Sequence, residues 1–245
     1  MALNTIGKGV PIAKLGKETI YVSEKPLEDG MTVMPAKNGD HFQQIPNKKS
    51  ERDVVMITAP SGSGKSHFCR EYLKIYHKMY PDNKVYLFSS LEKDETLDPL
   101  TFIKRIKVKS PAFLTMDLKI EDFKNTCVLF DDCDCIRDKA ILKQVYGIMN
   151  MVLETGRHEA CTVLVTSHAA TNGIQTRTIL REAKSVVIFP KTMGARNLKY
   201  LLTDYFGLDK SELKRVKDAP GRWVSIFRTF PVVCMSQDEV FQLRP

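Results

Sequence analysis

Residues 53 to 67 have the sequence Asp-Val-Val-Met-Ile-Thr-Ala-Pro-Ser-Gly-Ser-Gly-Lys-Ser-His, which places a strand, a loop and a helix in the order that a phosphate-binding loop requires. Val54 to Ile57 is an apolar run typical of a buried strand, and Phe68 to Tyr80 carries apolar residues at helical spacing. The glycine-containing stretch between them ends in Gly64-Lys65-Ser66. We therefore expect the chain to bind a nucleoside triphosphate, rather than to form a serine-glycine turn without a ligand.

The residue types in this loop assign the expected contacts. The two glycines let backbone N–H groups turn toward the phosphates, and the start of the helix adds its positive dipole end. Lys65 is expected to reach the β- and γ-phosphates, and the Ser66 hydroxyl to hold Mg²⁺. The first glycine position of the motif is Ala59, which can close the loop if its φ stays negative. The expected nucleotide-binding residues are Ser61, Gly62, Ser63, Gly64, Lys65, Ser66 and His67.

An acidic pair follows another predicted buried strand. Cys127-Val-Leu-Phe is an apolar run, and it is followed directly by Asp131 and Asp132. The carboxyl ends of parallel strands share one edge of a sheet, where ligands of open α/β sheets bind. We expect Asp131 to hold the magnesium ion through water and Asp132 to polarise the attacking water. The alternative is an acidic pair that caps a loop or begins the next helix.

Polar residues also end the next predicted strand, Cys161 to Thr166. His168 is the expected residue that senses the γ-phosphate or orients water, with Thr166 and Ser167 as the next candidates. The alternative for His168 is an exposed loop histidine.

An arginine from a neighbouring subunit often neutralises charge in phosphoryl transfer. Arg157, Arg177 and Arg181 flank the fourth strand and the helix after it, and Arg181 is the first choice as a catalytic arginine. Surface arginine is the expected fate of the others.

Length, charge and cysteine content bound the class of protein. The 245 residues suffice for one α/β domain with additions, and the formal net charge of +8 favours a polyanionic partner such as nucleic acid. The six cysteines lie in predicted core elements, which favours an intracellular protein with reduced thiols. A metal cluster of Cys133, Cys135, His158 and Cys161 is rejected because the spacing fits no common zinc pattern. No segment approaches the roughly 18 apolar residues of a membrane span, so we expect no membrane insertion.

Strands and helices are predicted to alternate along the core. Further strands are expected at Lys84 to Ser89 and Ser185 to Phe189, helices at Ala140 to Leu153 and Ile174 to Ala183, and an edge strand or short helix at Ile103 to Lys109. This alternation predicts an α/β fold with a mainly parallel sheet and helices on both faces.

Three segments are expected along the chain. Residues 1–50 are predicted to form an N-terminal extension with one or two short strands, and residues 51–191 the nucleotide-binding core. Residues 192–245 are predicted to form helices, at Leu198 to Phe206 and Ser211 to Val216, and a terminal hairpin of Trp223 to Phe227 with Val232 to Met235. The terminal segments are expected to pack on the core.

With these motifs the chain resembles the FtsK–HerA superfamily, and within it the genome-packaging ATPases of large double-stranded DNA viruses and their virophage satellites. The resemblance covers about residues 50 to 190, in Ser61 to Ser66, Val128 to Asp132, Gly156 to His158, Val163 to His168 and Ser185 to Phe189. It implies a RecA-like P-loop fold and a ring, usually hexameric, in which ATP hydrolysis drives double-stranded DNA through a central pore.

The resemblance also implies residue roles. Lys65 and Ser66 become nucleotide and magnesium ligands, Asp131 the magnesium anchor and Asp132 the catalytic carboxylate. Many members have Glu where this chain has Asp132, and a Gln is frequent near His168. No motif here marks the arginine finger or the DNA contacts. The densest basic cluster of the core, our candidate for phosphate contacts, is Lys104, Arg105, Lys107 and Lys109.

The sequence therefore favours an oligomeric, Mg-dependent ATPase that moves double-stranded DNA to package a viral genome. We expect a soluble virus-encoded protein of the host cytoplasm or virion, with capsid-vertex or portal proteins as further partners. The main alternative is a P-loop kinase acting on a small-molecule or nucleoside acceptor, which needs a lid over the phosphates. A helicase loader with a separate helical lid domain and a nucleotide-binding scaffold without turnover are further alternatives.

Overall fold

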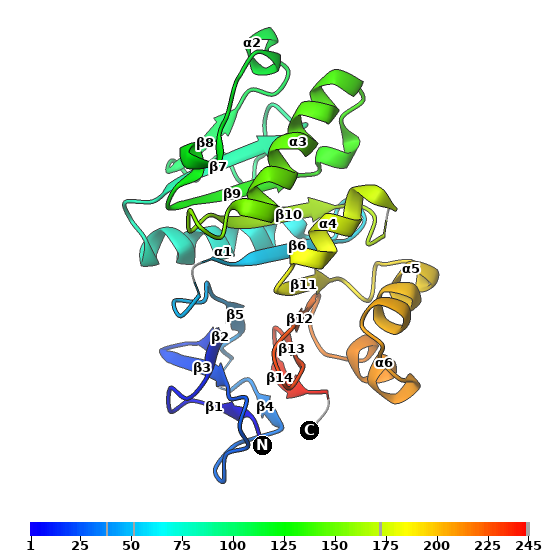
Figure 1. Ribbon diagram of the computed structural model, residues 1–245. Helices are drawn as coiled ribbons and strands as arrows, with labels where there is room; N and C mark the ends of the chain where they lie inside the picture. Colours follow the sequence, from blue (N-terminus) through cyan, green and yellow to red (C-terminus); the bar gives the residue numbers. More distant parts are fainter. Residues whose placement is uncertain (38, 51, 172, 244–245) are drawn as a thin grey trace.

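A ten-stranded sheet lies at the centre of the molecule, in the order β4-β14-β13-β12-β11-β6-β10-β9-β7-β8 (Figure 1). A computed structural model describes residues 1–37, 39–50, 52–171 and 173–243, and only the backbone of residues 174 and 175. The predicted boundary at residue 51 and the last two residues of the chain lie outside this description. The parallel strands are β6 (Val54–Thr58), β7 (Lys84–Ser89), β8 (Ile103–Ile106), β9 (Thr126–Asp131), β10 (Thr162–Ser167) and β11 (Ser185–Ile188).

Helices cover both faces of the parallel strands because the central strands are apolar on both sides. In β6, Val54 and Met56 join one buried cluster, whereas Val55 and Ile57 join the other. One face is covered by α1 (Lys65–Met79), and the other by α3 (Lys139–Thr155) and α4 (Ile174–Glu182) (Figure 1). This arrangement confirms the predicted α/β fold with a mainly parallel sheet and helices on both faces.

The ends of the two longest helices follow from local sequence. Gly64 at φ 110 precedes α1, and α1 ends at Met79 because Tyr80 comes before a proline, where helical φ and ψ are disfavoured. At the start of α3 the Asp138 carboxylate accepts hydrogen bonds from the N–H groups of Ala140 and Ile141. The short elements are α2 (Pro111–Leu114), η1 (Ile120–Phe123) and η2 (Cys133–Cys135).

The C-terminal segment continues the central sheet. After α5 (Ala195–Lys199), the π-helical turn η3 (Tyr200–Tyr205) and α6 (Lys210–Lys217), the strands β12 (Val224–Phe227), β13 (Val233–Ser236) and β14 (Glu239–Gln242) follow. β12 pairs antiparallel with β11 and with β13, so the expected hairpin is present and extends the sheet. The sequence analysis missed β14, whose Glu-Val-Phe-Gln sequence lacks a long apolar run.

The N-terminal segment contains more strands than predicted. A four-stranded sheet in the order β1-β3-β2-β5 lies below the parallel strands and beside β12 to β14 (Figure 1). Its strands are β1 (Leu3–Asn4), β2 (Val10–Leu15), β3 (Glu18–Val22) and β5 (Phe42–Gln44), whereas β4 (Val33–Pro35) pairs with β14. Apolar residues of this sheet pack against β13 and β14, in a cluster that includes Ile12, Phe42, Val233 and Val240. Burial against another sheet, rather than local propensity, therefore decides these strands.

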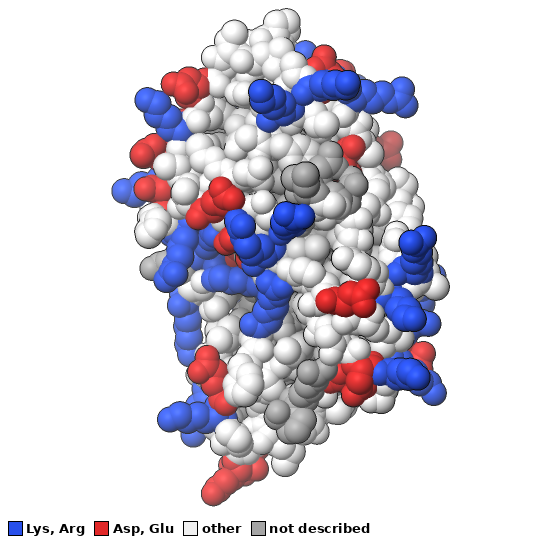
Figure 2. All heavy atoms as spheres, turned by 45° about the vertical axis from the view of Figure 1, so that its right-hand side comes forward, with Lys and Arg blue, Asp and Glu red and all other residues white. Residues whose placement is uncertain are grey.

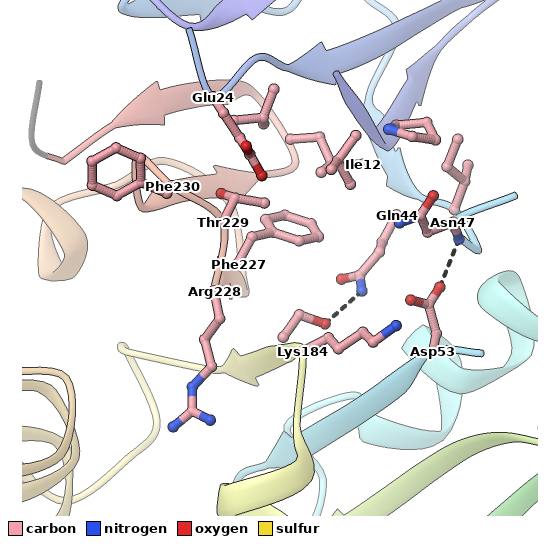
Figure 3. A pocket seen from close by; sticks show the side chains of 15 residues that line it. Ile12, Glu24, Gln44, Asn47, Asp53, Lys184, Phe227, Arg228, Thr229 and Phe230 are labelled. Atoms are coloured by element: carbon pink, nitrogen blue, oxygen red, sulfur yellow. Dashed lines mark hydrogen bonds between the residues drawn. The ribbon is translucent and has the colours of Figure 1, made fainter. Parts of the chain in front are cut away.

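A buried glutamine ties the two sheets together. Gln44 of β5 donates to Ser185 Oγ of β11 at 2.8 Å and accepts from Ser225 Oγ of β12 at 2.6 Å. Figure 3 shows Gln44 in a pocket lined by both sheets, with Asp53 and Lys184 nearby. Ser185 begins β11 and Asp53 precedes β6, so this pocket lies at the end of the strands opposite the phosphate-binding loop.

Replacing Gln44 by Ala is expected to lower the free energy of unfolding by about 2–4 kcal/mol, because two buried serine hydroxyls lose their partner. Urea denaturation measures the change. Gln43→Ala, at the exposed neighbouring position of the same strand, is the matched control and is expected to change stability by less than about 0.5 kcal/mol. Equal effects of the two substitutions would contradict the role of Gln44 as a tie between the sheets.

Candidate active site

Three neighbouring strands bring the predicted site residues to one edge of the sheet. β10 lies between β6 and β9 and pairs in parallel with both. The phosphate-binding loop follows β6, the acidic pair ends β9, and Thr166 to His168 end β10. Residues that are far apart in the sequence therefore share the carboxyl edge, where open α/β sheets bind ligands.

The loop has the backbone that its glycines allow. Gly62 and Gly64 have φ values of 75° and 110°, in the left-handed region that a side chain disfavours. Among the described residues other than glycine, positive φ occurs at Asn125, Asp132 and Ala160. Ala59 therefore keeps the negative φ that the sequence analysis required. The Ser63 hydroxyl lies 2.8 Å from the Thr192 hydroxyl, which connects the loop to the segment after β11.

Lys65 connects the loop to the acidic pair. Its side chain is buried, and its Nζ donates to the carbonyl oxygen of Ala59 at 3.0 Å. The same Nζ lies 3.4 Å from Asp132 Oδ1. The ammonium group is thus held between the start of the loop and the acidic pair, where its positive charge could interact with a bound phosphate chain.

Thr166 connects the two aspartates. Its buried hydroxyl lies 3.0 Å from Asp131 Oδ1 and 2.9 Å from Asp132 Oδ1, and it accepts from the Asp132 N–H at 2.7 Å. One hydroxyl proton serves both carboxylates. Ser89 at the end of β7 donates to Asp131 Oδ2 at 3.2 Å.

The backbone at Asp132 explains a departure from the family pattern. Asp132 has a φ of 44°, a conformation that Asp and Asn adopt far more readily than longer side chains. A Glu at this position would be strained, so the shorter acid suits this strand end.

Burial changes the acidity of Asp131. Loss of solvent, and then the negative charge of Asp132, raise the pKa of the Asp131 carboxyl from 3.8 to about 6, although hydrogen bonds from Thr166 and Ser89 oppose the shift. The ionised form therefore needs a nearby cation. The Ser66 hydroxyl and the Asp131 carboxylate are oxygen donors of the kind that Mg²⁺ prefers, and the buried negative charge gives such a cation a reason to bind.

Without Mg²⁺, we expect stability to fall as the pH rises from about 4 to about 6. Over that range the unfolded chain loses the Asp131 proton while the folded protein keeps it, which costs the folded state up to about 3 kcal/mol. The midpoint of urea unfolding, measured at a series of pH values, tests this dependence. Asp131→Asn should make the slope shallower and raise stability at pH 7, while the buried Asp53, whose pKa is also raised by loss of solvent, still contributes to the slope. An unchanged slope in this variant would contradict the assignment.

His168 lies at the centre of the site. Its Nε2 is 2.9 Å from the Ser61 hydroxyl of the loop and 3.4 Å from Asp132 Oδ2. Its Nδ1 faces away from these groups, 3.4 Å from Cys135 Sγ and 3.5 Å from Asp134 Oδ1. The imidazole thus contacts both the phosphate-binding loop and the acidic pair.

The candidate arginines lie elsewhere in the chain. Arg181 is in the last turn of α4, just before β11 begins, and binds Glu154 and Glu182 at 3.0 Å each. Within one subunit it is therefore not brought to the site, and a catalytic role would require a neighbouring subunit. Arg157 follows α3 and Arg177 lies within α4.

The basic cluster forms the edge strand β8 and the residues after it. Lys104, Lys107 and Lys109 are exposed, whereas Arg105 binds Asp98 and the Leu91 carbonyl oxygen. Lys109 lies 3.6 Å from Glu92. Acidic residues of the preceding loop thus neutralise part of the cluster. On the face drawn in Figure 2, basic side chains likewise gather in several groups with acidic residues among them.

Sequence reasoning missed Ser89, Asp134 and Thr192 as residues of the site. The signal for Ser89 was available, because it ends β7 as the acidic pair ends β9. Asp134 accepts hydrogen bonds from Ser167 Oγ and the His168 N–H, both at 3.0 Å. Its contacts depend on the turn η2, which the sequence does not mark.

The strand arrangement, the loop and the acidic pair define the chain as a RecA-like P-loop nucleotide-binding protein. No family model matches the chain. It is 37% identical over 238 residues to uncharacterized protein V3 of the Sputnik virophage, with 94% of each chain covered. The chain therefore belongs to the family of this virophage protein, which agrees with the resemblance to proteins of virophages found in its motifs.

Solved structures share the fold. The genome packaging NTPase B204 of Sulfolobus turreted icosahedral virus 2, in complex with AMP, matches with a TM-score of 0.52 and 13% identity, over 77% of this chain and 98% of that one. The pCW3 conjugation coupling protein TcpA, with ATPγS, matches with a TM-score of 0.54 and 11% identity, over 96% of this chain and 77% of that one. The cytoplasmic domain of the type VII secretion ATPase EccC of Thermomonospora curvata matches with a TM-score of 0.54 and 13% identity, over 93% of this chain and 28% of that one. Among the helices described in our chain, none combines the length and apolar character needed to cross a bilayer.

Proposed function

We propose that this protein is an ATP-driven translocase of double-stranded DNA that packages a viral genome into its capsid. The observation that carries the proposal is the convergence of Lys65, the acidic pair and His168 at one sheet edge. Membership in a virophage family and a fold shared with a packaging NTPase support it.

The residues of the site suggest how ATP is hydrolysed. Backbone N–H groups between Ser61 and Ser66 hold the phosphates, and Lys65 neutralises charge that builds up on the γ-phosphate. Asp132 accepts a proton from the attacking water, while the Thr166 hydroxyl keeps its carboxylate in place. His168 senses the γ-phosphate through its contacts with Ser61 and Asp132. Ser66, and Asp131 through water, would hold Mg²⁺, which would supply positive charge to the phosphates.

The working form is proposed to be a homo-oligomeric ring, hexameric by resemblance. Residues 51–191 form the ATPase core, with residues 1–50 and 192–245 as additions to it. Arg181 of a neighbouring subunit is the first candidate for the arginine finger, and would exchange its partners Glu154 and Glu182 for the nucleotide. Capsid-vertex or portal proteins are its proposed further partners, in the host cytoplasm or virus factory. Its mass with and without a nonhydrolysable ATP analogue tests assembly.

DNA stimulation of ATP hydrolysis is the test of the proposed function. We expect duplex DNA to raise the ATPase rate at low salt, with phosphate released to water. A rate that duplex DNA leaves unchanged would contradict translocation. Transfer of the phosphate to an added nucleoside or small-molecule acceptor would instead support the kinase alternative.

The basic cluster is the candidate DNA contact, and its role predicts a change in salt dependence. The logarithm of the binding constant falls linearly with the logarithm of the salt concentration, and each lysine that contacts a phosphate makes this slope steeper by about 0.9. The double variant Lys104→Ala, Lys107→Ala should therefore make the slope shallower by about 2. Lys14→Ala, Lys17→Ala removes the same charge from exposed positions of the N-terminal sheet region and should leave it unchanged. Equal slopes for both double variants, measured by duplex binding at several salt concentrations, would count against the cluster.

A further inference from the structure

Three side chains with different metal-binding atoms meet beside the nucleotide site. Asp134 and Cys135 belong to η2, the turn after β9, and His168 follows β10. One ligand atom from each residue lies within 4.8 Å of the other two. The sequence analysis rejected a different set, Cys133, Cys135, His158 and Cys161, because its spacing fits no common zinc pattern, and it considered His168 only for the nucleotide.

The two distances from the histidine nitrogen to the other ligand atoms fit a small tetrahedral cation. His168 Nδ1 is 3.4 Å from Cys135 Sγ and 3.5 Å from Asp134 Oδ1. Zn²⁺ binds nitrogen and oxygen at about 2.0 Å and sulfur at about 2.3 Å, so adjacent ligands of a tetrahedral site stand about 3.3–3.6 Å apart. Thiolate, imidazole and carboxylate together favour zinc over magnesium or calcium, which prefer oxygen ligands only.

Neighbouring residues orient Asp134 and His168 by hydrogen bonds, as residues around a metal site orient its ligands. Asp134 Oδ2 accepts from Ser167 Oγ and from the His168 N–H, which leaves Oδ1 pointing at the histidine. That Oδ1 is buried and accepts no hydrogen bond from the described residues. On the other side of the imidazole, Nε2 lies 2.9 Å from Ser61 Oγ and 3.4 Å from Asp132 Oδ2, the kind of partner that fixes a ligating histidine.

Cys135 also differs from the other cysteines in its exposure to solvent. All six cysteines of the chain are described, and Cys135 is exposed while the other five are buried. A cation can therefore reach Cys135 from solvent without local unfolding.

We propose that Asp134, Cys135 and His168 form a binding site for a zinc-class divalent cation, with a fourth position open to water. The Cys135 thiol releases its proton to solvent on binding, and the imidazole binds through Nδ1. Because Nε2 of the same ring faces Ser61 and Asp132, the cation would be coupled to the proposed ATP site, although no nucleotide is needed for it to bind.

The test is titration of the reduced, nucleotide-free protein with Co²⁺ and Zn²⁺ in excess Mg²⁺, which occupies oxygen-only sites. The wild-type protein is expected to bind one Co²⁺ with a thiolate-to-metal absorption band, and Zn²⁺ should displace it. Cys135→Ser should lose the band and weaken Zn²⁺ binding by about 100-fold, while Ser167→Ala should keep the band and weaken binding by about tenfold. Circular dichroism confirms that each variant is folded.

His41→Ala is the matched control, because His41 lies 2.9 Å from Asp238 in an exposed histidine–carboxylate pair that lacks a thiol. It should bind both metals as the wild type does. The absence of a thiolate band in the wild-type protein, or equal Zn²⁺ affinity of wild type and Cys135→Ser, would overturn the site. Since no nucleotide is present, neither result depends on whether the protein hydrolyses ATP.

Discussion

Replacing Lys65 by Ala is expected to lower the rate constant of ATP hydrolysis by at least about 10²–10³-fold. Its Nζ is held between the Ala59 carbonyl oxygen and Asp132, where it can follow charge as it develops on the γ-phosphate. Phosphate release at saturating Mg-ATP measures the effect.

Loss of Lys65 also removes the ammonium group that lies 3.4 Å from Asp132 Oδ1, so stability must be followed in parallel. Lys65→Met keeps most of the aliphatic length of the side chain, so it distinguishes the effect of losing the charge from the effect of losing packing contacts. Lys74→Ala, on the exposed side of the same helix, removes a lysine paired only with Glu71 and should leave turnover unchanged. Hydrolysis that continues in a folded Lys65→Ala protein would remove the loop from the mechanism.

Asp132→Asn is expected to lower turnover by about 10²–10⁴-fold while nucleotide binding persists. The amide cannot accept the proton of the attacking water, and this is the usual magnitude of a lost general base. Asn tolerates the φ of 44° at this position, so the strand end should keep its shape. Single-turnover hydrolysis and the binding of a fluorescent ATP analogue separate the two effects.

Two companion variants sharpen this result. Asp132→Glu restores a carboxylate but places a longer side chain in the left-handed region, at a cost of roughly 1–2 kcal/mol, so partial activity is expected. Asp138→Asn, at the start of α3, changes a carboxylate outside the site and should leave turnover intact. Full activity in a folded Asp132→Asn protein would show that another group activates the water.

The sequence alone determined the parts of this protein that depend on local order. A strand, a loop with glycines at fixed positions and a helix are consecutive in the chain, so residues 53 to 67 predict both a structure and a ligand. The apolar run before Asp131 likewise places a carboxylate at a strand end. The C-terminal hairpin followed from short apolar segments bounded by turns. The segment Ile103 to Lys109, which the sequence left open as an edge strand or a short helix, contains the edge strand β8.

Tertiary structure decided what depends on which strands are neighbours. Thr166 contacts both aspartates, and His168 reaches Ser61, because β10 lies between β6 and β9. The N-terminal strands exist because they bury apolar residues against β13 and β14, at the far end of the chain. The grouping of Asp134 and Cys135 with His168 depends on a short turn facing the end of another strand. Contacts between segments distant in sequence leave no periodic trace, so only the folded chain brings these groups together.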